Sequence, residues 1–165
     1  MKKFFCLLFI FSVITGITFA IELEGGVSFN VDSAKKYIQE GLPDEIEINQ
    51  PKYFDKDDPT IQKVVFSYNN EGKVIGITVQ YKNEPAKAYI YGKSKHLIYI
   101  EQYDKPVNIY PHRGYRYNLD GTLNLTSLTV SKNEMFRFTP NGKLLAHSLN
   151  GIIYDENGEV IGSGK

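Results

Sequence analysis

Cysteine, tryptophan and net charge are all scarce in this sequence. It has one cysteine, no tryptophan, and 19 basic against 19 acidic residues. The single Cys6 lies in a stretch interpreted below as a cleaved signal, so the mature domain would have no disulfide, thiol nucleophile or thiolate metal site. The lysines and arginines occur singly, without the clustered basic stripe that nucleic-acid binding needs. Stability must therefore come from burial of a core, for which about 145 residues suffice in one domain.

Residues 1–20 have the pattern of an export signal. Lys2 and Lys3 give a positive start, residues 4–14 are apolar, and Ala20 ends a small-residue cleavage pattern. An uncleaved anchor is the alternative, because the stretch is near the ~20 residues that cross a bilayer. We expect an exported protein, located in the periplasm, the cell envelope or outside the cell, with no membrane span after signal cleavage.

The remaining chain divides into two regions that we expect to form one domain. Residues 21–60 carry ten acidic and four basic residues, whereas residues 61–165 carry nine acidic and thirteen basic ones. The first region contains the one predicted helix, which Asp32 or Ser33 can cap and which Gly41 can end. An acidic, proline-bearing stretch follows it and should be irregular, because proline cannot donate to a central strand ladder.

A short phrase occurs four times in the second region: an aromatic, three residues, glycine, one residue, then Val or Leu. Each copy indicates a strand, a tight turn and the next strand. Three of the turns centre on Asn-Gly or Asp-Gly, where both residues tolerate positive φ. The separations between successive copies are irregular, at 49, 21 and 16 residues. The predicted turn-forming glycines are Gly72, Gly121, Gly142 and Gly158.

Alternation of apolar and polar residues predicts further strands between these turns. They are expected near residues 75–81, 86–91, 97–103, 123–130, 135–139, 144–149 and 152–154. The connections are only a few residues long, which favours antiparallel pairing, because parallel strands need long crossovers. The predicted fold class is mainly β: an antiparallel meander of about ten short strands joined by tight hairpin turns, with one short N-terminal helix.

The phrase [Tyr/Phe]-x-x-x-Gly-x-[Val/Leu] resembles the MORN-variant repeats of bacterial proteins often labelled as toxin–antitoxin antitoxin components. It is similar, more distantly, to the tyrosine–aspartate repeats of large bacterial surface proteins. The resemblance covers about residues 63–160, although the Gly-x-Trp or Gly-x-Tyr step common between such repeats is missing. It implies a meandering sheet of hairpins that serves binding or display without catalysis.

Tyrosine is concentrated in the predicted sheet, where ten of the twelve tyrosines lie between Tyr68 and Tyr154. Such rings can pack across strands on a half-buried sheet. Alternatively, they can form a stacking platform for a ligand. The candidate binding surface consists of Tyr89, Tyr91, Tyr99, Tyr103, Tyr115 and Tyr117.

The sequence contains no recognisable catalytic constellation, so we expect no enzyme, cofactor or metal. The histidines, His96, His112 and His147, are widely spaced and form no ligand pair. The acidic residues 55–58 suit calcium by type but lack the glycine and glutamate of a calcium loop. Glu101 and Glu134 are the acids to examine first for an acid–base pair.

The leading hypothesis is an exported, non-enzymatic binding or structural module that presents a sheet surface to a protein or an envelope polymer. One alternative is a small secreted hydrolase of cell-wall material that uses carboxylates in a sheet groove. Another is an immunity or inhibitor partner of a secreted toxin. An open meander also exposes its terminal strands, which predicts self-association or strand addition by a partner.

Overall fold

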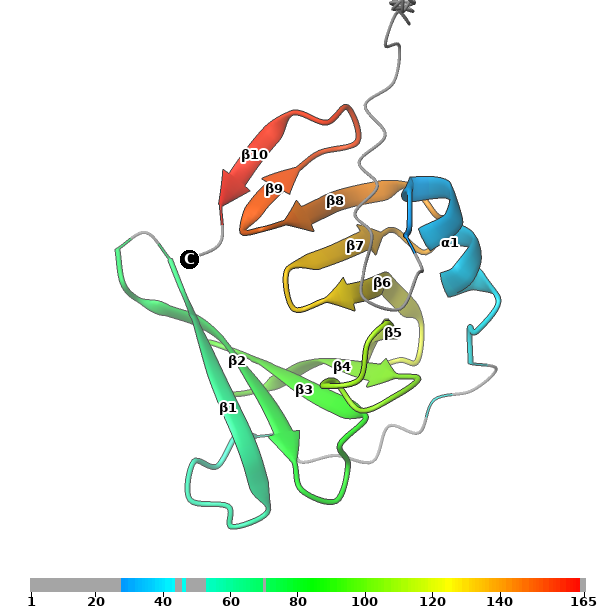
Figure 1. Cartoon of the computed structure of the whole chain (residues 1–165). Coiled ribbons are helices and arrows are strands. Elements are labelled where there is room, and N and C mark those ends of the chain that lie inside the picture. Colours follow the sequence, from blue (N-terminus) through cyan, green and yellow to red (C-terminus); the bar gives the residue numbers. More distant parts are fainter. Residues whose placement is uncertain (1–27, 44–45, 47–52, 70, 164–165) are drawn as a thin grey trace, which may run out of the picture.

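The computed structural model describes residues 28–43, 46, 53–69 and 71–163. One helix, α1 (Val31–Gln39), precedes ten strands that pair antiparallel in chain order in a single sheet (Figure 1). The strands are β1 (Ile61–Tyr68), β2 (Val74–Tyr81), β3 (Lys87–Gly92), β4 (Leu97–Tyr103), β5 (His112–Asn118), β6 (Leu123–Ser131), β7 (Glu134–Phe138), β8 (Leu144–Leu149), β9 (Ile152–Tyr154) and β10 (Val160–Ser163). The predicted fold class is thus confirmed. The predicted export signal lies outside the described residues, among which no helix is long and apolar enough to cross a membrane.

Helix α1 begins with a capping box two or three residues earlier than the sequence indicated. The cap is Asn30, whose side chain accepts a hydrogen bond from the Ser33 N–H, while the Ser33 hydroxyl accepts one from the Asn30 N–H. Ser33 is therefore the third residue of the helix, where it completes the box, and Asp32 lies in the first turn. At the other end, the Ile38 carbonyl accepts two hydrogen bonds, one from the Tyr115 hydroxyl over 2.9 Å and one from the Gly41 N–H over 3.2 Å, so a carbonyl of the last helical turn is satisfied.

The repeated phrase forms one kind of turn at alternate hairpins. The aromatic residue pairs with the Val or Leu six positions later, and the glycine has a φ of 75, 84, 81 or 79° in the four copies. This is a three-residue loop with a left-handed residue that forms a bulge. In the three copies that have Asn or Asp before the glycine, that residue does not have a positive φ, so the glycine is the one that uses the left-handed region. Within the described residues, the turn with two positive φ values is Asn150-Gly151, at 50 and 81°.

The β3–β4 turn is a fifth copy that the sequence pattern did not reveal. Tyr91 pairs with Leu97, and Lys95 occupies the glycine position with a φ of 65°. The Gly92 N–H donates to the His96 carbonyl over 2.9 Å, and the Lys95 N–H donates to the Gly92 carbonyl over 2.9 Å, as at the other turns. With Lys95 included, the separations become 23, 26, 21 and 16 residues, so the sheet consists of five consecutive hairpin units.

One face of the sheet is covered by the N-terminal segment and holds the core. Ala34 and Ile38 of α1 pack on buried residues of the β5–β7 region, and Figure 1 shows α1 against these strands. Phe54 covers a second cluster formed mainly by β2, β3 and β4. The half-buried Ile46 packs against both clusters, so it links the part of this face under α1 to the part under Phe54.

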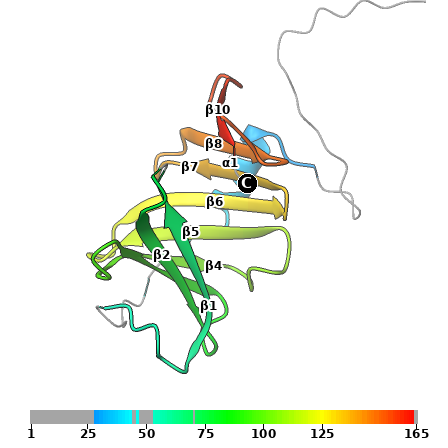
Figure 2. The ribbon, with the colours of Figure 1, turned by 90° about the vertical axis from the view of Figure 1, so that its left-hand side faces the viewer.

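The sheet curls so that its opposite face is concave and open. Figure 2 views this face, with β1 and β2 crossing in front of the middle strands. Lys63 of β1 and Ser148 of β8 line the same hollow, although six strands separate them in the sheet order. Within the described residues β1 and β10 are not paired with each other, so the curled sheet does not close into a barrel.

Candidate functional site: the concave groove

The concave face contains a groove of about 630 Å³ lined by side chains from β1, β4, β5, β6, β7 and β8. Alternation along each strand produces it, because residues at every second position face the groove while their neighbours face the core. On β6, Ser127, Thr129 and Ser131 line the groove, whereas Leu128 and Val130 are buried in the core. Strand β6 thus contributes a row of hydroxyl groups to the groove, and the other lining residues come from distant parts of the sequence.

An ion pair lines the groove. Glu101 on β4 pairs in register with Arg116 on β5, and Arg116 Nη2 and Nε donate to Glu101 Oε2 over 2.9 and 3.3 Å. Gly114 lies two residues before Arg116, and a Cβ there would stand 2.5 Å from Ser127 Oγ and 3.1 Å from the Tyr103 ring. The missing side chain at Gly114 thus lets Tyr103 and Ser127 approach each other over the strand.

Aromatic rings form one wall of the groove. The rings of Tyr103 and His112 meet edge to face at 5.5 Å, and Tyr110 stacks on His112 at 5.5 Å. His112 is fixed because its Nδ1 lies 3.1 Å from the Ile109 carbonyl. Burial, with a further contribution from the Glu101 charge, raises the pKa of the Tyr103 hydroxyl above its ordinary value. This hydroxyl therefore stays protonated at neutral pH and can donate a hydrogen bond.

Three cations of the groove are uncommitted. Lys63, Lys132 and Arg137 line it, and none makes an ion pair or hydrogen bond with any part of the chain that the structure describes. All three side chains are exposed. In the sequence these charges are spread singly and gave no signal of a basic cluster. The curl of the sheet brings them to one hollow.

The structure corrects the predicted tyrosine surface. Four of its six members, Tyr89, Tyr91, Tyr115 and Tyr117, are buried in the core on the covered face. The physical reason is register: these residues occupy the positions that alternate with the groove-facing ones. Tyr99 and Tyr103 lie on the concave face and are half-buried. A sequence rich in tyrosine thus uses most of these rings as core, and only two of the six remain accessible to a ligand.

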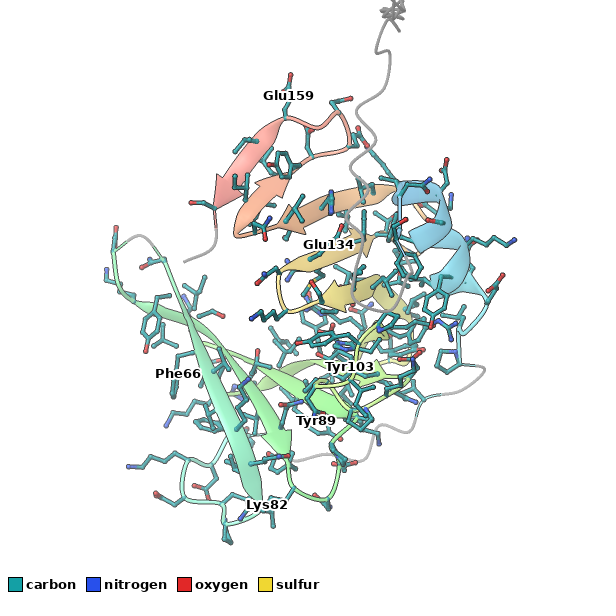
Figure 3. The ribbon with its side chains drawn as sticks, in the orientation of Figure 1. Phe66, Lys82, Tyr89, Tyr103, Glu134 and Glu159 are labelled. Atoms are coloured by element: carbon teal, nitrogen blue, oxygen red, sulfur yellow. The ribbon has the colours of Figure 1, made fainter. Side chains whose placement is uncertain are left out.

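Glu101 and Glu134 point to opposite faces of the sheet. Figure 3 labels Glu134 on β7; its Oε1 lies 3.0 Å from His147 Nε2. The His147 ring in turn stacks at 4.1 Å on the core residue Phe136. Glu134 borders the groove, but this bond holds its carboxylate on the covered side, whereas Glu101 pairs with Arg116 on the concave side. Each of the two acids therefore has a partner of its own, Arg116 for Glu101 and His147 for Glu134.

The other residues considered for metal binding are also separated. His96 lies at the β3–β4 turn against Tyr53, with ring centroids 4.4 Å apart, whereas His112 faces the groove. Asp55 accepts the Asp57 N–H over 3.0 Å and Asp58 accepts the Thr60 N–H over 2.8 Å, so these two carboxylates stabilise turns. Within the described ranges, no group of three or more potential metal ligands occurs.

One sequence signal could have located the groove. Residues 127, 129 and 131 of β6 are all hydroxyl-bearing, and they alternate with apolar residues. A run of this kind marks a strand with one polar face. The Glu101–Arg116 pair and the uncommitted cations come from other strands, however, and only the register and curl of the sheet place them around that run.

No protein-family model, curated protein or solved structure matches this chain. The assignment of a function therefore depends on the geometry of the groove.

Proposed function

We propose that this chain is a non-enzymatic binding module whose ligand occupies the concave groove. The observation that carries this proposal is the hollow of about 630 Å³, which six strands line with polar, charged and aromatic side chains. Ligand sites in proteins are typically concave, largely preformed and furnished with a few convergent polar groups. The export signal predicted for residues 1–20 supports a location outside the cytoplasm, where the ligand would be a protein or a polymer of the cell envelope.

The two faces of the sheet have different tasks under this proposal. The covered face stabilises the fold, because α1 and Phe54 pack there on a core rich in tyrosine and phenylalanine. The concave face carries polar groups that contribute little to such a core. The Glu101–Arg116 ion pair in its lining holds the Arg116 guanidinium in place, so a ligand meets a preordered surface. Rigid, preordered groups lower the entropy cost of binding.

Filling the groove should abolish binding without unfolding the chain. Thr129→Phe places a ring on the groove floor, whereas Thr78→Phe places the same ring on a half-buried β2 position that does not line the groove. Both variants are first compared with the unsubstituted chain by circular dichroism and thermal unfolding. Binding is then measured by biolayer interferometry against immobilised neutral saccharides, acidic saccharides and acidic peptides.

The proposal expects at least one class to bind the unsubstituted chain and the Thr78→Phe variant, and to lose binding to the Thr129→Phe variant. Two results contradict it. In the first, no class binds the unsubstituted chain. In the second, binding survives in the Thr129→Phe variant while that variant remains folded.

A further inference from the structure

We infer that the ligand of the concave groove is an acidic saccharide, meaning a chain of sugar units that carry carboxylate, sulfate or phosphate groups. This inference rests on the proposed function, because it names the ligand class for the same groove. Three independent features of the groove carry it: its charge, the kind of hydrogen-bonding groups on its floor, and its aromatic wall.

The charge of the groove is positive once its internal bonds are counted. The two acids that line it already have partners, Glu101 with Arg116 and Glu134 with His147. No other acidic side chain of the described residues lines the groove. The remaining cations are therefore not neutralised from within and are available to an anionic group of the ligand. Anions that reach a guanidinium in this way form short, charge-assisted hydrogen bonds.

These cations also come from separate elements that line the groove. Lys63 comes from β1, Arg137 from β7, and Lys132 from the turn between β6 and β7. A single small anion would need one concentrated site. A ligand with several separated charges fits three cations on different elements better, and an acidic polymer carries charges at regular intervals.

The floor of the groove favours a saccharide over a peptide. It is built from central strands whose backbone N–H and C=O groups are already engaged in the sheet ladders. A peptide bound in extended form is typically recognised through free backbone groups at a sheet edge, which this floor lacks. The floor instead offers the hydroxyl groups of Thr129, Ser131 and Ser148, whereas Ser127 is buried and its hydroxyl donates to the Gly114 carbonyl. Hydroxyl groups can both donate and accept, which matches the hydroxyls of a sugar ring.

The aromatic wall supplies the third feature. Tyr110 is 44% exposed and stacks on His112 at the border of the groove, where its ring is accessible to a flat apolar surface. Sugar rings present such a surface through their C–H groups, next to their hydroxyls. Tyr103 adds a protonated hydroxyl at the same wall.

The test compares four probes: a polygalacturonate oligomer with carboxylates, a heparin oligosaccharide with sulfates, the neutral sugar cellohexaose, and poly-glutamate as an acidic chain without sugars. Binding to the unsubstituted protein is measured by isothermal titration calorimetry at low and high salt. The variants are Arg137→Gln, Lys63→Gln, Tyr110→Ala and Thr129→Phe. The control Lys93→Gln removes the same charge from the exposed β3–β4 turn, outside the groove.

We expect one or both acidic saccharides to bind more tightly than cellohexaose and poly-glutamate, and to weaken as salt screens the charges. Arg137→Gln should weaken this binding about tenfold, Lys63→Gln and Tyr110→Ala should weaken it by smaller factors, and Lys93→Gln should leave it unchanged. Which acidic saccharide binds identifies the source of the charge.

The outcomes separate this inference from the proposed function. If cellohexaose or poly-glutamate binds as tightly as the acidic saccharides, and Thr129→Phe abolishes that binding, the groove is the site but the ligand class is wrong. If an acidic saccharide binds and Arg137→Gln has no more effect than Lys93→Gln, the inference is overturned as well. If no probe binds, or if binding is insensitive to Thr129→Phe, both the inference and the proposed function are contradicted.

Discussion

Lys95→Gly should stabilise the protein, although glycine substitutions in ordered chains usually do the opposite. Lys95 has a φ of 65° at the position that glycine occupies in the other four equivalent turns. A residue with a Cβ raises the free energy of the folded state by about 1–2 kcal/mol when it adopts this left-handed conformation. Glycine loses roughly 0.5–1 kcal/mol more backbone entropy on folding. The difference predicts a net gain of about 0.5–1 kcal/mol in the free energy of unfolding.

The gain can be measured by urea denaturation and by thermal unfolding. A stabilisation of this size should raise the melting temperature by about 1–4 °C, given that 1 kcal/mol corresponds to about 2–4 °C for domains of about this size. The midpoint in urea should rise without a change in slope, because the surface exposed on unfolding stays the same. The reciprocal variant, Gly121→Lys, should destabilise by about 1 kcal/mol, since Gly121 has a φ of 84°.

Lys93→Gly is the matched control. It changes the same residue type in the same turn, but at a position that lacks a positive φ. It should be neutral or slightly destabilising, because it adds chain entropy to the unfolded state without relieving strain. If Lys95→Gly lowers stability as much as Lys93→Gly does, the fifth turn does not share the geometry of the other four, and the five-hairpin interpretation is refuted.

Three further predictions follow from the packing. Gly114→Ala should lower the free energy of unfolding by about 1–3 kcal/mol, because the added Cβ would stand 2.5 Å from Ser127 Oγ. Adding Ser127→Ala should restore part of this loss in a double-mutant cycle, and strictly additive effects would contradict the contact. Burial raises the pKa values of the Tyr89, Tyr91 and Tyr115 hydroxyls above the value of ~10 that tyrosine has in an unfolded chain. The stability that these rings contribute is therefore complete below that pH and is lost as the pH rises further. Tyrosinate absorbance should show the three rings ionising together with alkaline unfolding, and independent ionisation in the folded state would argue against the buried core. Strand β1 lies at the edge of the sheet, and its Val65 and Phe66 are 45% and 43% exposed, so we expect the protein to self-associate through this edge. Light scattering should show an apparent mass that rises with concentration and that rises less in the Val65→Lys variant. A chain that stays monomeric at every concentration would rule this out.

The sequence predicted the meander well because its signals are local. Short turns and period-two alternation depend on neighbouring residues, so the fold class and the four turn glycines could be read directly. The fifth turn was not predicted because Lys95 occupies the position that glycine has in the other copies, although the flanking Tyr91 and Leu97 have the required spacing. The cap of α1 was misplaced by a few residues for a related reason, since Asn30, Asp32 and Ser33 are all residues that commonly cap helices.

The groove could not be predicted because it depends on long-range register. Tyrosines on the two faces of a strand look alike in sequence, and only the covering by α1 and Phe54 decides which face becomes core. The polar lining of the other face is likewise assembled from several strands. Glu101 and Arg116 are 15 residues apart in the chain, yet they pair directly across β4 and β5.

The most direct test of the account is a map of where a ligand contacts the sheet. A polygalacturonate oligomer is titrated into the isotopically labelled protein, and its amide and arginine Nε–H resonances are followed by nuclear magnetic resonance. We expect shifts confined to the groove-lining residues of β1 and β4–β8 and of the connections between those strands, including the Arg137 side chain, with α1 unaffected. Unchanged spectra, or shifts centred on α1 and the covered face, would contradict the claim that the concave groove is the binding face.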